Sequence, residues 1–179
     1  MKYLKIIALI IVIVVGSMAL YVWMAPPKSP LDSAVYSSGS YDLEVVYSRP
    51  YKKGRLIFGS KDDGALVPYG GYWRTGANAA TTFMTKSDIE FGGKKISAGK
   101  YRLYSVPDTK SWSIFLNSEA DKYFAIMDPD RTKDVLEIEI SPSTIEAPVE
   151  QLTFAFYNDS TGVSLALKWD ATLISIPIK

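Results

Sequence analysis

This sequence predicts an all-β fold, an antiparallel β-sandwich or open barrel, preceded by one N-terminal transmembrane helix. From residue 41 onward, apolar and polar residues alternate with a period of two over short segments, and turn-forming residues separate these segments. The composition agrees, because Tyr, Val, Ile, Phe and Thr, which favour strands, are abundant. The longest apolar run lies instead at the amino terminus, and a length of 179 residues suits one globular domain with such an appendage.

Two amino acids are missing from the composition, and their absence excludes several kinds of chemistry. The chain has no cysteine and no histidine, which removes disulfides, Cys/His zinc sites, histidine-ligated haem and triads that use imidazole as the base. It also removes the acylated cysteine that tethers bacterial lipoproteins. We expect no catalytic residue, no metal and no cofactor. The formal net charge is only +1, and the chain has no block of basic residues, so we do not expect it to bind nucleic acid.

The N-terminal apolar run, Ile6–Met24, has the length and the flanks of a transmembrane anchor. It contains no charged residue, and at about 1.5 Å per residue its helix would be roughly 28 Å long, about the thickness of a hydrocarbon core. Trp23 lies at its far end, where interfacial aromatic residues are found. Lys2 and Lys5 precede the run, so we predict that residues 1–25 cross the bacterial inner membrane with the amino terminus in the cytoplasm.

A cleaved secretory signal peptide is the competing interpretation of the same run. The apolar region of such a peptide is usually about 7–15 residues long and ends at a small-x-small site. Ser17 and Ala19 form such a site, and cleavage after Ala19 or Ala25 stays open. Under either interpretation the rest of the chain lies in the periplasm.

Between the apolar run and the first predicted strand lies a segment rich in proline and serine. Successive prolines lack N–H donors and restrict their neighbours, so Ala25–Pro30 cannot be helical. Residues 31–40 are small and polar. We predict a linker over residues 26–40 and an extracytoplasmic β domain over residues 41–179.

Within the β domain, about ten short strands are expected, with a hairpin turn at Gly92 and Gly93. In the segment 135–140, Leu136, Ile138 and Ile140 should point inward and the two glutamates outward. The expected strands are 41–48, 79–85, 89–91, 94–97, 101–106, 112–116, 123–127, 135–140, 152–156, 163–169 and 173–178.

Residues 48–78, which we call the signature segment, combine aromatic rings, positive charge and turn residues more densely than any other part of the chain. If the segment forms a pocket, its guanidinium groups would bind a carboxylate or phosphate, and its aromatic faces would suit a sugar. If the segment has a structural role instead, its glycines would form tight turns, its aromatic residues would fill the core, and Arg74 would be a buried donor. We expect the architectural role to dominate. The candidate ligand contacts are Arg49, Arg55, Tyr69, Trp73, Arg74 and Asn78.

Several blocks of this sequence resemble one bacterial family, the domain of unknown function 2911. They read SRPYKKGRLIFG, LVPYGGYWRTGAN, KKISAGKYRLYSVP, VEQLTFAF and LALKWD, and the resemblance covers essentially residues 41–179. The resemblance implies a β-rich bacterial envelope protein and supplies no activity. Two departures stand out: Ala79 occupies the place where the family typically has Glu, and extra residues occur at Ser60–Gly64. If that Glu acts as a ligand or catalytic group in relatives, a scaffolding role becomes more plausible for this chain.

Carboxylate pairs offer a weaker, catalytic interpretation. Glu137 and Glu139 lie two apart on a predicted strand and so share one face, as a glycosidase pair would. A solvated outer face explains them better, because the residues that alternate with them are apolar. The Asp62-Asp63 and Asp128-x-Asp130 groups lack further ligands for calcium and read as turns.

These observations favour a single-pass, non-catalytic accessory subunit of a larger membrane protein complex, such as a respiratory, photosynthetic or secretion complex. Its partners would be other integral membrane subunits and the lipid bilayer. The alternatives are a periplasmic module that binds a glycan or a small anion through the signature segment and, less favoured, a carboxylate-based hydrolase.

Overall fold

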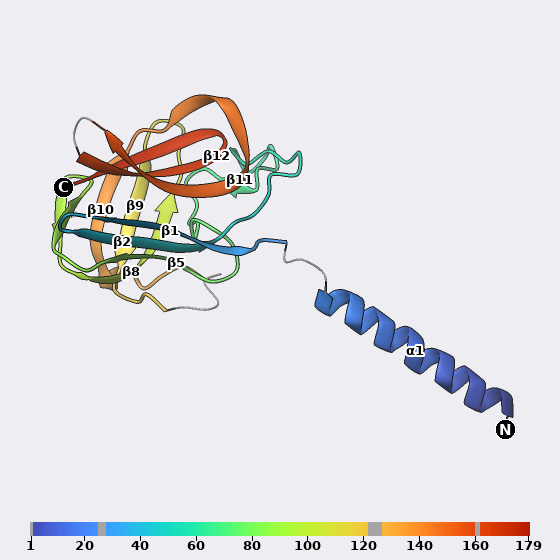
Figure 1. Cartoon of the computed structure of the whole chain (residues 1–179). Helices are drawn as coiled ribbons and strands as arrows, with labels where there is room; N and C mark the ends of the chain where they lie inside the picture. Colours follow the sequence, from blue (N-terminus) through green and yellow to red (C-terminus); the bar gives the residue numbers. More distant parts are fainter. Residues whose placement is uncertain (1, 25–27, 122–126, 160–161) are drawn as a thin grey trace.

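The computed structural model describes residues 2–24, 28–121, 127–159 and 162–179, and shows an N-terminal helix followed by antiparallel β-sheets (Figure 1). The elements are α1 (Lys2–Met24), β1 (Leu31–Ser38), β2 (Tyr41–Ser48), β3 (Phe58–Gly59), β4 (Val67–Pro68), β5 (Thr81–Thr85), β6 (Ile89–Phe91), β7 (Lys94–Ile96), β8 (Gly99–Val106), β9 (Trp112–Asn117), a 3₁₀ turn (Arg131–Lys133), β10 (Asp134–Ile140), β11 (Ser143–Asp159) and β12 (Gly162–Ile178). The all-β antiparallel prediction is confirmed. The strand predicted over residues 123–127 falls almost entirely outside the described residues.

Two sheets build the β domain. In the described chain, the larger sheet has six strands in the order β1-β2-β5-β8-β9-β10, and the second has four in the order β11-β12-β6-β7. All neighbouring pairs within these two sheets are antiparallel. A short parallel pair, β3 with β4, stands apart from both. The arrangement fits a β-sandwich.

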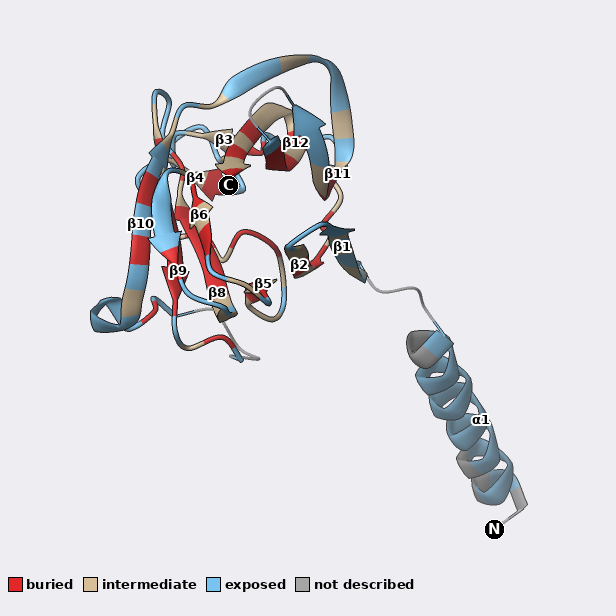
Figure 2. Cartoon of the chain, turned by 60° about the vertical axis from the view of Figure 1, so that its left-hand side comes forward, coloured by how far each residue is buried: buried red, intermediate tan, exposed pale blue. Residues whose placement is uncertain are grey.

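Alternating side chains form the core, as the period of two predicts. On β2, Leu43, Val45 and Tyr47 are buried, while the residues between them are partly exposed. On β10, Leu136 and Ile138 are buried and the glutamates between them are exposed. Figure 2 shows buried residues in strands of both sheets. The hydrophobic effect on these inward faces holds the sheets together.

The β domain begins earlier than predicted, because the expected linker contains a strand. Leu31–Ser38 forms β1, which pairs along its whole length with β2. This strand lies at the edge of its sheet and has little to bury: Leu31 and Val35 are exposed, and Ala34 and Tyr36 pack on the core. A short, small-residue edge strand therefore carries only a weak hydrophobic pattern.

The C-terminal strands are longer than predicted. Residues 152–156 belong to the 17-residue β11, and the two segments 163–169 and 173–178 belong to the 17-residue β12. Register shifts along β11 interrupt the pairing, and Asp170 on β12 has a left-handed φ of 54°. These irregularities bend one continuous hairpin and break its sequence pattern without ending the strands.

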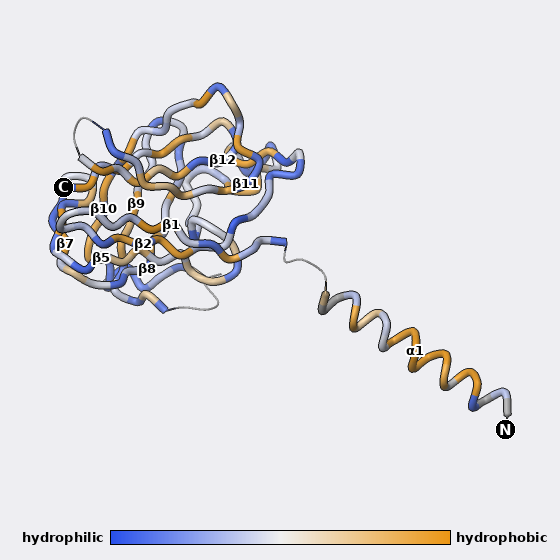
Figure 3. The backbone as a smooth tube through the Cα atoms, in the orientation of Figure 1, coloured by the Kyte–Doolittle hydropathy of each residue, from blue (hydrophilic) through white to orange (hydrophobic). Residues whose placement is uncertain are grey.

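The N-terminal helix α1 exists, although its membrane-spanning character is not supported. Its apolar residues include Ile6, Leu9 and Val12, all exposed, and Figure 3 shows hydrophobic colour along most of its length. Among the residues that the structure describes, no helix combines the length and the apolar character needed to cross a bilayer.

Candidate functional site

The signature segment leaves β2 and is fastened to strands at both of its ends. Near its start, the Lys52 N–H donates to the Glu150 carbonyl at 2.7 Å, and Pro50 accepts from the Leu152 N–H at 3.0 Å, so this end follows β11. Near its other end, Trp73 exchanges two backbone hydrogen bonds with Ser105 of β8, at 2.8 and 2.9 Å. The segment thus spans the end of the domain between the two sheets.

The turn after Trp73 depends on a position that only glycine fits. A Cβ atom at Gly76 would lie 2.8 Å from the Thr81 Oγ1 and 3.3 Å from the Ser48 carbonyl oxygen. Thr75 before it has a φ of 55°, and its buried hydroxyl lies 2.9 Å from the Ser105 hydroxyl. This packing presses the turn onto the strands and leads to Asn78, whose φ of 58° turns the chain into β5.

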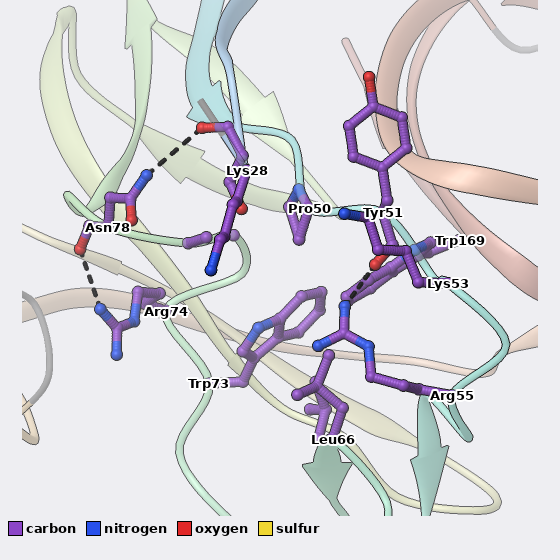
Figure 4. A pocket seen from close by; sticks show the side chains of 14 residues that line it. Lys28, Pro50, Tyr51, Lys53, Arg55, Leu66, Trp73, Arg74, Asn78 and Trp169 are labelled. Atoms are coloured by element: carbon purple, nitrogen blue, oxygen red, sulfur yellow. Dashed lines mark hydrogen bonds between the residues drawn. The ribbon is translucent and has the colours of Figure 1, made fainter. Parts of the chain in front are cut away.

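An open cleft of about 690 Å³ lies over this segment. Figure 4 shows Arg74 and Asn78 on one side, Tyr51, Lys53 and Arg55 on the other, and the indole of Trp73 between them. The lining comprises Lys28, Ser29, Pro50, Tyr51, Lys53, Arg55, Leu66, Val67, Trp73, Arg74, Gly76, Ala77, Asn78 and Trp169.

Positive charge dominates the lining of this cleft. Lys28, Lys53, Arg55 and Arg74 contribute four cations, and the described lining residues include no carboxylate. One acid lies just outside: the Glu150 carboxylate accepts the Lys53 backbone N–H at 2.8 Å. That contact leaves the Lys53 ammonium group available, 5.9 Å from the centre of the Tyr51 ring. The cleft is therefore electrostatically suited to an anion.

Backbone carbonyls hold both cleft arginines in place without neutralising them. Arg55 donates from Nε to the Lys52 carbonyl at 3.0 Å and from Nη2 to the Tyr51 carbonyl. Arg74 donates from Nη1 to the Asn78 carbonyl at 2.9 Å. Because a guanidinium has five N–H donors, each arginine keeps donors for a further acceptor.

Tryptophan side chains make the floor of the cleft. Trp73 and Trp169 both line it, and their rings stack with centroids 5.9 Å apart. Phe58 packs edge-on against both, Trp112 packs edge-on against Trp73, and Phe58 lies 4.8 Å from Trp112 and 5.5 Å from Trp73 between ring centroids. Within the described part of the chain, the buried Nε1 of Trp169 has no hydrogen-bond partner. This unpaired N–H is enclosed in the core, where the lack of an acceptor costs free energy.

The structure brings four of the six candidate residues to the cleft and assigns the other two elsewhere. Arg55, Trp73, Arg74 and Asn78 line it, and Tyr69 does not. Arg49 is structural: it donates to the Asp32 carboxylate at 2.8 Å, the Leu152 carbonyl at 3.0 Å and the Thr153 hydroxyl at 2.9 Å. These bonds join the first strand to β11.

The prediction that Arg74 is the buried donor of the segment is wrong. Arg74 is partly exposed on the cleft, whereas Arg102 of β8 is only 3% exposed. Arg102 donates to the Tyr72 hydroxyl and, at 3.3 Å, to the Met127 carbonyl, and its guanidinium lies over the Tyr72 and Tyr104 rings. Arg102 lies among alternating strand residues, so no local pattern indicates that its charge is buried.

Ten of the fourteen lining residues were not among the candidates, and three of these ten show why. Lys28 lies in the proline-rich stretch, Lys53 follows a second lysine, and Trp169 comes from β12, far along the chain. The LALKWD block contains Trp169 and was a usable signal. Only the folded arrangement of β12 against the signature segment shows that this block shares a site with the others.

The departure at Ala79 lies outside the cleft. Ala79 lines a different hollow of about 270 Å³, together with Lys100 and Asp121, which form an ion pair. The residue at this position therefore does not affect the cleft lining. In the described residues no group of three or more acidic side chains could hold a metal ion.

Comparison with known proteins places the chain in a family. The model of the family described as "Protein of unknown function (DUF2911)" matches residues 29–178. The chain belongs to this family. The match starts just before β1, in agreement with the observed beginning of the β domain, and it includes all the cleft-lining residues except Lys28. No curated protein and no solved structure matches the chain.

Proposed function

We propose that the β domain of this DUF2911 protein is a non-catalytic binding module whose cleft takes a small anion. The observation that carries the proposal is the set of four cations, Lys28, Lys53, Arg55 and Arg74, around one open cleft. A carboxylate or phosphate fits such a set, because arginine forks bind planar and tetrahedral oxyanions through paired hydrogen bonds.

The chemistry of the lining favours binding over hydrolysis. It supplies hydrogen-bond donors from Arg55, Arg74 and the Asn78 amide, and aromatic faces from the two tryptophans. The carboxylates once considered for a hydrolase, Glu137 and Glu139, lie exposed on β10 and line another hollow. The aromatic floor would suit the apolar face of a sugar, so a phosphorylated sugar combines both recognition elements.

The proposal is tested by titrating the chain with glucose 6-phosphate and with glucose while intrinsic tryptophan fluorescence is recorded, because Trp73 and Trp169 line the cleft. We expect saturable binding of the phosphorylated sugar. An Arg55→Gln/Arg74→Gln variant should weaken it about 10-fold or more, since a hydrogen bond to a charged group contributes about 1.5–3 kcal/mol.

Lys95→Gln is the matched control, because Lys95 is an exposed cation on β7 outside the cleft. It should bind like the unaltered chain. Equal binding of glucose and glucose 6-phosphate would instead favour a glycan site, and an Arg55/Arg74 variant with unchanged affinity would overturn the proposal.

A second candidate function concerns the N-terminal helix. We propose that α1 holds the β domain at the bacterial inner membrane, with the domain in the periplasm, as an accessory subunit of a larger membrane protein complex. The supporting observation is the uncharged run Ile6–Met24, whose described apolar side chains are exposed. An apolar helical surface of this extent requires lipid or other helices around it.

Two measurements on the native protein test this role. Mass spectrometry should find an amino terminus before Ile6, and alkaline extraction should leave the protein in the membrane fraction. Purification in mild detergent should then yield integral membrane subunits in fixed ratio. A native amino terminus after Ala19 or Ala25 would show that the helix is a removed signal peptide.

A further inference from the structure

The cleft lies within a short length of chain from α1. Residues 25–27 alone separate Met24, the last residue of the helix, from Lys28, which lines the cleft. An extended chain advances at most about 3.6 Å per residue, so Lys28 lies no more than about 14 Å from the helix end. If α1 is held in a bilayer, this distance keeps Lys28 close to the lipid headgroups.

Exposed leucines stand at the mouth of the same cleft. Leu66 lines it and is 42% exposed, and Leu56, which follows Arg55, is 45% exposed. The Leu66 N–H donates to the Leu56 carbonyl at 3.0 Å, so the two residues lie side by side. Exposed aliphatic side chains next to cations are typical of loops that enter the interface of a membrane.

We propose that the cleft binds the phosphate headgroup of an anionic phospholipid in the membrane that holds α1. This inference rests on the proposed anion-binding function and on the helix as the tether. Arg55 and Arg74 bind the phosphate oxygens from opposite sides of the cleft, and Lys28 and Lys53 add positive charge near the bilayer surface. Leu56 and Leu66 lie toward the acyl chains.

The energetics agree with this assignment. Each lysine or arginine near an anionic leaflet gains attraction that decays within about a Debye length, roughly 8 Å at physiological salt. The short connection keeps Lys28 within about 14 Å of the helix end, which is less than two Debye lengths.

The experiment uses the full chain carrying Trp23→Phe, which removes the one tryptophan of the helix. The protein is reconstituted into nanodiscs of phosphatidylcholine with or without phosphatidylglycerol, and the fluorescence of the remaining tryptophans is recorded. We expect a change with phosphatidylglycerol that rising salt weakens. Arg55→Gln/Arg74→Gln should require about 10-fold more of the anionic lipid for the same change, and Lys95→Gln should leave the response unaltered.

A second variant separates lipid binding from binding of a free phosphate ester. Leu56→Ser/Leu66→Ser should weaken the response to phosphatidylglycerol, while titration in detergent with glycerol 1-phosphate stays as in the parent. If glycerol 1-phosphate binds but phosphatidylglycerol gives no response, the cleft serves a soluble anion: the proposed function stands and the lipid assignment falls. If neither binds, both fall. Failure of the chain to enter nanodiscs also overturns the lipid assignment.

Discussion

The guanidinium of Arg102 lies over the rings of Tyr72 and Tyr104, where water is excluded. Cation–π contacts and the hydrogen bonds from Nη2 replace part of its hydration, while its buried Nε has no hydrogen-bond partner among the described residues. Arg74 has the opposite situation. It is partly exposed, and its one protein partner among the described residues is the Asn78 carbonyl.

The two arginines should therefore respond differently to substitution. Arg102→Ala should lower the free energy of unfolding by about 3 kcal/mol, because it removes a desolvated cation–π contact and leaves the Tyr72 hydroxyl exposed to a cavity. Arg74→Ala should lower it by less than about 1 kcal/mol, and yet weaken anion binding. Urea unfolding of both variants decides the matter. A larger loss of unfolding free energy in Arg74→Ala than in Arg102→Ala would mean that Arg74 is a buried structural donor and not a ligand contact of the cleft.

Gly76 allows a second prediction at this scale. Gly76→Ala should destabilise the domain by about 1–3 kcal/mol, because the added Cβ meets Thr81 Oγ1 at 2.8 Å and the Ser48 carbonyl at 3.3 Å. Gly71→Ala is the matched control, since its Cβ would make only one contact, 3.4 Å from the Pro68 carbonyl. Thermal melting of the pair measures the difference, and equal melting temperatures would contradict the close packing at Gly76.

The raised pKa of Tyr104 predicts that the stability of the fold decreases at alkaline pH. Burial and then the hydrogen bond to Asp134, 2.6 Å from its hydroxyl, raise the pKa of Tyr104 well above the ordinary value of a tyrosine. The folded protein thus keeps the proton at a pH where the unfolded chain, with a pKa near 10, releases it. The contribution is complete below about pH 10 and is lost as the pH rises toward the folded pKa.

Unfolding free energy should accordingly fall above pH 10, by up to about 1.4 kcal/mol per pH unit for each such tyrosine. Tyr104→Phe should reduce this slope, while Tyr47 and Tyr101, whose pKa values burial also raises, keep part of it. Urea titrations from pH 8 to 11 measure the slope. An unchanged slope in Tyr104→Phe would show that Tyr104 loses its proton equally readily in both states.

At the scale of elements, the sequence predicted strands well where one face is buried and poorly where little is buried. The strands β2 and β10 show period-two patterns because their alternate residues enter the core. The edge strand β1 was taken for a linker, and β3 with β4 are two residues each, too short for any pattern. Backbone pairing, which no sequence pattern records, holds these elements.

The difference between nearby and distant residues in the sequence explains which residues of the cleft could be predicted. Four of the predicted residues share the cleft because they lie in one contiguous segment whose ends are fixed. Trp169 lies on β12, about a hundred residues after the signature segment, and Lys28 lies twenty residues before it. Only the folded chain brings these two residues to the cleft. Periodicity is a local signal and cannot supply such contacts.

The position of β1 leads to a prediction about domain boundaries. A chain that starts at residue 41 should be less stable than one that starts at residue 29, by about 2–4 kcal/mol, because it loses the whole β1–β2 ladder and the ion pair between Arg49 and Asp32. Urea unfolding of the two truncated chains compares them. Equal urea midpoints would mean that residues 31–38 act as a linker and do not stabilise the domain.

For the whole molecule, the short connection between α1 and the β domain is what links the cleft to a membrane surface. Figure 1 shows the chain entering the domain beside the loops of the signature segment, so that tether and cleft share one end of the domain. A tether of this length gives a high effective concentration of headgroups at the cleft, and the benefit falls as the connection grows.

Inserting about 30 Gly/Ser residues before Lys28 should therefore separate folding from lipid binding. Such a segment has a mean span of about 30 Å, well beyond the Debye length. The urea midpoint of the β domain should not change, because the insertion precedes β1, while the fluorescence response to phosphatidylglycerol in nanodiscs should weaken. The same insertion ahead of Lys2 is the control and should leave that response intact. Equal responses from both insertions would mean that the cleft finds its anion without help from the helix.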